Sequence, residues 1–98
     1  MTGTNENIPE VTVKLFAHFR ESAGNVKEVI IAARTVGELV DELMCRFEGL
    51  KGQISKDGKL RLYVNIMVNG VSISDLNGMD TKLNPDCEVA IFPPVSGG

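Results

Sequence analysis

The sequence predicts an α+β domain in which one helix packs across one face of a β-sheet. Residues 11–17 and 62–68 alternate apolar and polar side chains, the pattern of half-buried strands. Only residues 35–47 repeat their apolar side chains at helical spacing. Because strand-like segments flank this one helix, the elements fit a single sheet with the helix on one face. One helix leaves the opposite face of the sheet available to a partner.

The first hairpin is expected from residues 11–17 and 26–33, joined by a glycine-containing connector. Phe16 falls on the solvent side of the first strand, where its ring is either covered by the fold or part of a docking surface. Ile30 faces away from the core in the second strand. The core-facing residues of the first strand are expected to be Val11, Val13, Leu15 and Ala17.

A helix is expected to begin after Thr35, because Thr35-Val36-Gly37-Glu38 fits the capping-box pattern S/T-x-x-E. In that motif the Thr35 hydroxyl accepts from the Glu38 N–H, and the Glu38 carboxylate accepts from the Thr35 N–H. Gly49 is the expected C-terminal stop of the helix. The apolar stripe expected to face the sheet consists of Val36, Leu39, Val40, Leu43, Met44 and Phe47.

The second half of the chain predicts a polar loop, a long strand and a tight hairpin. Residues 50–59 are polar and contain glycine, which is typical of a loop. Asn69-Gly70 favours a two-residue turn because both residues can adopt positive φ, and residues 71–73 then return as a brief strand. The core side of the long strand is expected to consist of Leu62, Val64, Ile66 and Val68.

The last elements are a linker, a turn and a final strand. Leu76 and Leu83 are expected to pin the turn-rich linker to the core. Residues 84–86 form a turn with proline at its second position, and residues 87–92 form the last strand.

Composition favours one domain and excludes several classes of partner. The 98 residues carry a net charge of −3, so the charge balance does not favour binding to nucleic acid or to an anionic membrane. The chain lacks an apolar run of the roughly 20 residues that span a membrane, and it lacks a secretory signal pattern. A cytoplasmic location is expected. The expected organisation is a flexible tail (1–9), a domain (10–92) and an extended tail (93–98).

The side chains predict neither an autonomous enzyme nor a metal site. Cys45 and Cys87 lack the spacing of metal ligands and are expected to be free, buried thiols in a reducing compartment. His18 has no identifiable nucleophile to activate and is expected to lie at the surface. No metal and no bound cofactor are expected.

The C-terminal stretch, residues 92–98, is the most informative part of the chain. Pro93 and Pro94 cannot continue a sheet ladder, so they are expected to end the last strand and start a stiff extended tail. Gly97 and Gly98 have no side chains, and a terminal carboxylate there could enter a narrow active-site channel. A frayed terminus is the competing interpretation.

A carboxylate becomes reactive when a partner enzyme transfers it to the α-phosphate of ATP. The mixed anhydride formed has a good leaving group, and a sulfur or nitrogen nucleophile can then attack the carbonyl carbon.

Five segments of the chain carry a family resemblance: residues 13–21, 35–39, 68–70 and 86–92 and the terminal Phe92-Pro93-Pro94-Val95-Ser96-Gly97-Gly98. With these segments the chain resembles the MoaD/ThiS group of ubiquitin-like sulfur carriers, and the resemblance is strongest to MoaD, the small subunit of molybdopterin synthase. Two departures are visible: residues 84–86 replace a glycine-containing turn of many members, and the N-terminal tail is long. Neither departure touches the expected chemistry.

The resemblance implies a β-grasp fold, with a mixed sheet of four to five strands and one main helix on one face. It implies that a MoeB-like, ubiquitin-activating-type enzyme uses ATP to adenylate Gly98, which then becomes a thiocarboxylate. It also implies docking to a MoaE-like large subunit of molybdopterin synthase, which would supply the catalytic residues. The implied site residues are Gly97 and Gly98 at the reacting end, with Phe16, Phe92, Pro93, Pro94, Val95 and Ser96 as partner contacts.

Two other fates of the activated carboxylate stay open. A lysine amine could capture Gly98 as an isopeptide bond, which would make the chain a protein modifier. The sulfur could instead go to thiazole synthesis or to tRNA thiolation. The Phe-Pro-Pro run resembles the molybdopterin type more than a thiazole carrier.

Overall fold

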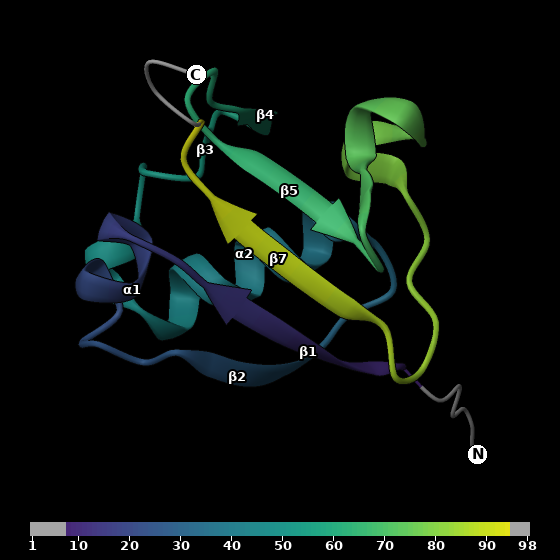
Figure 1. Cartoon of the computed structure of the whole chain (residues 1–98), viewed down its shortest axis with the longest axis horizontal. Helices are drawn as coiled ribbons and strands as arrows, with labels where there is room; N and C mark the ends of the chain where they lie inside the picture. Colours follow the sequence, from purple (N-terminus) through teal and green to yellow (C-terminus); the bar gives the residue numbers. More distant parts are fainter. Residues whose placement is uncertain (1–7, 95–98) are drawn as a thin grey trace.

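The computed structural model describes residues 8–94, and its main feature is a five-stranded sheet with one long helix behind it (Figure 1). The expected tails fall largely outside these residues, which exclude 1–7 and 95–98. The strands are β1 Glu10–Leu15, β2 Glu28–Ala32, β3 Ser55–Lys56, β4 Lys59–Leu60, β5 Asn65–Val68, β6 Val71–Ser72 and β7 Glu88–Phe92; the helices are α1 His18–Ser22 and α2 Val36–Arg46, and the 3-10 turns are Glu48–Leu50, Ile73–Asp75 and Gly78–Asp80.

The sheet is mixed, with the strand order β2-β1-β7-β5-β6. β1 and β2 form an antiparallel hairpin, as do β5 and β6. The last strand, β7, lies between the two hairpins, where it runs parallel to β1 and antiparallel to β5. This arrangement of five strands and one main helix agrees with the α+β class that the sequence predicts and with the β-grasp fold that the family resemblance implies.

The core lies between α2 and the inner face of the sheet. Val36, Leu39, Val40 and Leu43 of α2 are completely buried, as the apolar stripe predicts, whereas Met44 and Phe47 are half-buried. Burying one such aliphatic side chain stabilises the fold by about 1.5–3 kcal/mol. The sheet residues that meet this stripe include Val13, Leu15, Ile31, Ile66, Val89 and Ile91.

The start of α2 confirms half of the expected capping box. The Thr35 hydroxyl accepts a hydrogen bond from the Glu38 N–H at 3.2 Å. The Glu38 carboxylate, however, accepts from the Arg34 N–H at 2.9 Å rather than from the Thr35 N–H. The carboxylate thus reaches one residue further back and holds the chain that enters the helix from β2.

The expected end of α2 is wrong. The helix ends at Arg46, and Gly49 lies in the 3-10 turn Glu48–Leu50. This glycine has another role, because a Cβ built on it would lie 2.1 Å from the Ser22 carbonyl oxygen. Gly49 therefore allows two backbone segments to approach, one after α2 and one at the end of α1.

The connector after β1 contains a helical turn that the sequence does not predict. β1 ends at Leu15, and Ala17 is exposed with φ at 55°, so Ala17 is not part of the core face. This positive φ, with ψ at −135°, costs a non-glycine residue about 1–3 kcal/mol and reverses the chain into α1. Phe19 of α1 is completely buried and adds a large core residue.

The second half of the chain also departs from the expected strands. β5 begins only at Asn65, and Leu62 is fully exposed because it precedes the paired residues. The expected loop at residues 50–59 contains a buried Ile54 and part of the β3–β4 hairpin. Leu83 is buried as expected, but Leu76 is 43% exposed.

The structure confirms the two predicted turns and the predicted burial of one cysteine, but not of the other. Asn69 and Gly70 both have positive φ, at 51° and 84°, and join β5 to β6. The Cys87 N–H donates to the Asn84 carbonyl oxygen at 3.2 Å and closes the proline turn. Cys87 is a free, buried thiol, whereas Cys45 is free but exposed, because its side chain lies outside the apolar stripe of α2.

Gly49→Ala is expected to lower the free energy of unfolding by about 2–3 kcal/mol, since its Cβ would meet backbone rather than a flexible side chain. Gly52→Ala is the control: Gly52 has φ at +75° but no atom within 4 Å of a built Cβ. Its expected cost is about 1 kcal/mol, from conformation alone. Urea unfolding measures both variants, and equal losses would contradict the close approach at Gly49.

Candidate functional site

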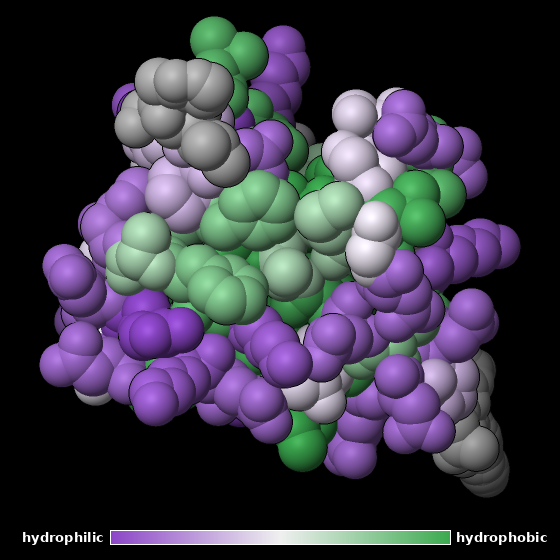
Figure 2. Space-filling model, viewed as in Figure 1, coloured by the Kyte–Doolittle hydropathy of each residue, from purple (hydrophilic) through white to green (hydrophobic). Residues whose placement is uncertain are grey.

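An apolar patch occupies the outer face of the sheet, on the side away from α2. No element of the described chain covers this face. Figure 2 shows hydrophobic surface gathered over the central strands and surrounded by hydrophilic residues. Strand register places Met67 beside Ala90 and Asn65 beside Phe92 on this face. We define the apolar patch as Phe16, Met67, Ala90 and Phe92, of which Phe16 is 38% exposed and the others are half-buried.

Phe16 is held at one end of this patch by contacts on both its backbone and its ring. Its N–H donates to the Ile91 carbonyl oxygen at 3.1 Å, which ties the residue after β1 to β7. Its ring lies edge-on to the Phe92 ring, with 6.4 Å between the centroids. Such a pair adds about 0.5–1.5 kcal/mol beyond the area that it buries. The sequence prediction of Phe16 as an outward-facing aromatic is therefore correct, although the residue lies just beyond the strand.

A cation covers part of the same ring. The Arg20 guanidinium carbon lies 5.8 Å from the Phe16 ring centroid, and Arg20 Nε donates to the Leu15 carbonyl oxygen at 3.0 Å. The second contact fixes the guanidinium at the end of β1, within the range of a cation–π interaction. Arg20 thus orients Phe16 and adds positive charge at the edge of the patch, a role that the sequence did not indicate.

The base of the expected tail is anchored in the centre of the sheet. β7 pairs with β1 on one side and with β5 on the other, so its direction is fixed by both neighbours. Exposure rises at the end of the described chain: Phe92 and Pro93 are half-buried and Pro94 is exposed. Val95, Ser96, Gly97 and Gly98 lie outside the described residues.

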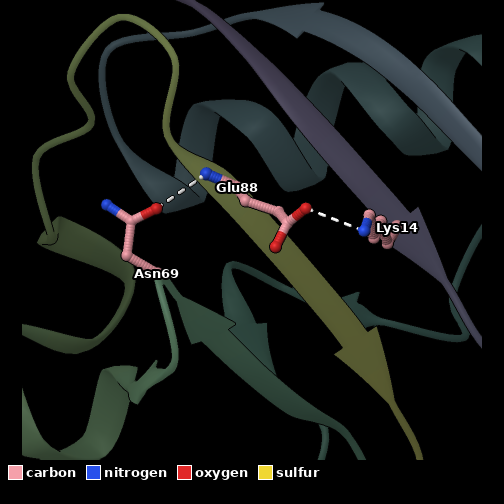
Figure 3. Close-up of polar contacts among 3 residues, drawn as sticks. All are labelled: Lys14, Asn69 and Glu88. Atoms are coloured by element: carbon pink, nitrogen blue, oxygen red, sulfur yellow. Dashed lines mark hydrogen bonds and ion pairs between the residues drawn. The ribbon is translucent and has the colours of Figure 1, made fainter.

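The start of β7 is held by Asn69 from the β5–β6 turn (Figure 3). Asn69 Oδ1 accepts from the Glu88 N–H at 2.9 Å, and the Asn69 N–H donates to the Glu88 carbonyl oxygen at 2.8 Å. Asn69 Nδ2 also donates to Cys87 Sγ at 3.5 Å. One turn residue therefore both makes the hairpin and fixes the strand that leads to the tail.

An ion pair crosses β1 and β7 on the outer face. Lys14 Nζ lies 2.8 Å from Glu88 Oε2 (Figure 3). The hydrogen bond to Glu88, followed by its charge and that of Glu28, raises the pKa of Lys14 above the ordinary 10.5. A raised lysine pKa adds stability that is complete below pH 10.5 and is lost as the pH rises through the folded-state value. The pair is therefore intact at neutral pH, and its solvent exposure keeps its contribution small.

The described residues hold no group of three or more His, Cys, Asp or Glu side chains arranged to bind a metal ion. His18 is exposed, as expected, and its ring lies 4.1 Å from the Phe19 ring between centroids. None of the helices in the described part of the chain is long and apolar enough to cross a membrane.

The sequence profile of the ThiS family matches residues 13–98, which is most of the chain and includes the terminal glycines. The chain belongs to the ThiS family. Small archaeal modifier protein 3 of Haloferax volcanii is 35% identical over 91 residues, which cover 91% of this chain and 99% of that protein. The sulfur carrier protein CysO of Mycobacterium tuberculosis is 31% identical over 91 residues, which cover 90% of this chain and 98% of that protein.

Solved structures of ThiS-like proteins have the same fold. Small archaeal modifier protein 1 of Methanosarcina acetivorans is similar with a TM-score of 0.83 and 37% identity, covering 92% of this chain and 97% of that chain. A putative molybdopterin converting factor subunit 1 from Pyrococcus furiosus is similar with a TM-score of 0.63 and 37% identity. The match covers 89% of this chain and 99% of that chain. The β-grasp fold and the family of ubiquitin-like sulfur carriers are thereby confirmed. Relatives named as carriers and as modifiers both match, so similarity alone does not choose the fate of the terminal carboxylate.

Asn69→Gly is expected to lower the free energy of unfolding by about 1 kcal/mol, because glycine keeps the positive φ but loses the side-chain bond to Glu88. Asn69→Ala is expected to cost about 1 kcal/mol more, since alanine disfavours that φ. Asn25→Gly, at an exposed residue with φ at 68°, is the control and is expected to be nearly neutral. Equal losses in Asn69→Gly and Asn25→Gly, measured by urea unfolding, would show that Asn69 does not hold β7.

Proposed function

We propose that this protein is a sulfur carrier that acts through the carboxylate of Gly98. The observation that carries the proposal is the family match through Gly98, on a chain whose central strand leads directly into the tail. The relative named a sulfur carrier supports the same chemistry. In this function the chain contributes the reacting carboxylate, and a partner enzyme contributes the catalytic residues.

The reaction proceeds in two balanced steps. A Gly98 carboxylate oxygen attacks the α-phosphorus of ATP, pyrophosphate leaves, and an acyl adenylate forms. Hydrosulfide then attacks the carbonyl carbon, AMP leaves, and Gly98 ends in a thiocarboxylate. ATP is bound by the adenylating partner, a MoeB-like enzyme of the ubiquitin-activating type, and not by this chain. Gly97 contributes the absence of a Cβ, which allows close approach to that partner.

The apolar patch is the proposed docking face for this partner. Phe16 and Phe92 present aromatic surface at one end of the patch, and aromatic residues are enriched in protein–protein interfaces. Pro93, Pro94, Val95 and Ser96 then set the distance and direction of Gly98 from the patch. A patch next to the tail base lets the same partner hold the body and receive the terminus.

The proposed destination of the sulfur is molybdopterin, with a MoaE-like large synthase subunit as the second partner. Similarity to the putative molybdopterin converting factor subunit 1 supports this destination. A second candidate function is protein modification, in which a substrate lysine takes the place of hydrosulfide. Similarity to small archaeal modifier protein 3 supports that candidate. Both functions share the adenylate, so one chain can serve both.

Incubating the protein with its cognate adenylating enzyme, ATP and sulfide should raise its intact mass by the replacement of one oxygen by sulfur. Deleting Gly98 should abolish the mass change, while thermal unfolding of the variant matches that of the wild type. A wild-type mass that does not change under these conditions would overturn the proposal.

The same deletion separates carrier from modifier in cells. If the protein is also a modifier, denaturing blots should show high-mass conjugates that disappear on deletion of Gly98. Thiocarboxylate without conjugates would support transfer of sulfur alone.

Phe16→Ser is expected to raise the protein concentration that half-saturates the adenylating enzyme by about tenfold, with the maximal rate unchanged. Ile30→Ser is the matched control, because Ile30 is 58% exposed on the same face of the sheet but lies on β2, outside the patch. Pyrophosphate exchange measures both variants. An equal effect of the two substitutions would show that the patch is not the docking face.

A further inference from the structure

A second exposed surface lies on the β3–β4 hairpin and the residues that follow it. Lys56 and Lys59 face each other across the hairpin. Leu62 is fully exposed and Tyr63 is 41% exposed, and the Arg61 guanidinium carbon lies 5.3 Å from the Tyr63 ring centroid. We call this surface the basic hairpin surface; the same five residues, with Leu60, line a shallow pocket.

The charge of this surface differs from that of the whole protein. Residues 51–63 contain four of the ten Lys and Arg residues of the chain and one of its 13 Asp and Glu residues. The whole chain carries a net charge of −3. A local cluster of positive charge on an acidic protein attracts an acidic partner and does so less strongly at high salt.

The packing of the fold does not account for the exposed side chain of Leu62. A side chain that is completely exposed buries no area against its own chain and adds nothing to the core. Tyr and Arg are the residue types enriched among those that dominate binding energy, and Leu62 adds exposed apolar area beside Arg61 and Tyr63.

The basic hairpin surface lies at the same end of the sheet as the tail base (Figure 1). The Arg61 N–H donates to the Ile54 carbonyl oxygen at 2.9 Å, and the Val64 N–H donates to the Arg61 carbonyl oxygen at 3.1 Å. These bonds fold the segment back just before β5. Because Asn65 pairs with Phe92, the residues before Asn65 and those after Phe92 lie at one end of the antiparallel pair.

We propose that the basic hairpin surface docks onto an acidic surface beside the tail channel of the adenylating enzyme. This inference rests on the proposed function, because that enzyme is the partner that receives the tail. Lys56, Lys59 and Arg61 attract the acidic surface, and Leu62 enters an apolar pocket within it. A partner thus holds the tail from two sides, with the apolar patch on the sheet face and the basic hairpin surface on the flank.

The test measures direct binding and pyrophosphate exchange with the purified cognate adenylating enzyme. Lys59→Glu/Arg61→Glu should raise Kd by about tenfold and reduce its dependence on salt, with the maximal exchange rate unchanged. The matched control is Lys27→Glu/Lys82→Glu, which makes the same change in net charge at two exposed lysines outside this surface. The control should change Kd by less than about twofold.

A second pair of variants tests the apolar contact without changing charge. Leu62→Ser should raise Kd by about fivefold, whereas Leu76→Ser, at another exposed leucine, should leave Kd unchanged. Leu62 is fully exposed, so Leu62→Ser should unfold at the temperature of the wild type, whereas Leu76→Ser should lose a little stability because Leu76 is 43% exposed.

The outcomes separate this inference from the proposed function. Normal adenylation with no difference between hairpin and control variants would overturn the docking surface and leave the carrier function in place. Salt-sensitive binding that the hairpin variants weaken, without any pyrophosphate exchange, would support the surface and overturn the carrier function. Binding of single-stranded RNA or of anionic vesicles that is lost in Lys59→Glu/Arg61→Glu, with enzyme binding unchanged, would assign the surface to another partner and overturn the inference.

Discussion

The parallel pairing of β7 with β1 is the contact on which the remaining structure depends. It joins residues at opposite ends of the chain, with Leu15 beside Ile91, and it brings the two hairpins into one sheet. Pairing over such a sequence distance carries a large loop-closure cost, which the fully buried Val13, Val89 and Ile91 offset. The same pairing fixes the direction of β7 as far as Phe92, so the fold and the position of the tail base have one cause.

Local patterns in the sequence predict which helices and strands are present better than they predict the residues at which these elements begin and end. The stripe of α2 and the Asn69-Gly70 turn depend on neighbours in the chain, and the structure confirms both. Alternation predicted a strand from Leu62, yet pairing begins at Asn65, because an alternating pattern does not reveal where a partner strand ends. The position of Gly49 after the apolar stripe predicts a helix stop, although its small size serves a contact with Ser22 that only the folded chain creates.

The candidate site was also predictable only in part, because local patterns indicate which side of a strand a residue faces but not which strand lies beside it. Phe16 was identified because an aromatic residue interrupted the polar side of a strand. Alternation along the chain places Met67 on the outer side of its strand, but it predicts neither Met67 nor Ala90 as a site residue. Their adjacency depends on the pairing of β5 with β7, which no local pattern reveals. Arg20 was missed because its helical turn follows Ala17, whose positive φ the sequence does not indicate.

The parallel direction of β1 and β7 has a practical consequence for handling the protein. Both strands run toward the end of the sheet where Pro94 leaves the body, so the first residue of β1, Glu10, lies at the opposite end, about 20 Å away along six residues of strand. An affinity tag, a fluorophore or a linkage to a solid support placed ahead of Glu10 is therefore attached at the end of the sheet opposite to Phe16, Phe92 and Pro94. Attachment at that end is the arrangement that suits binding assays and fusion proteins.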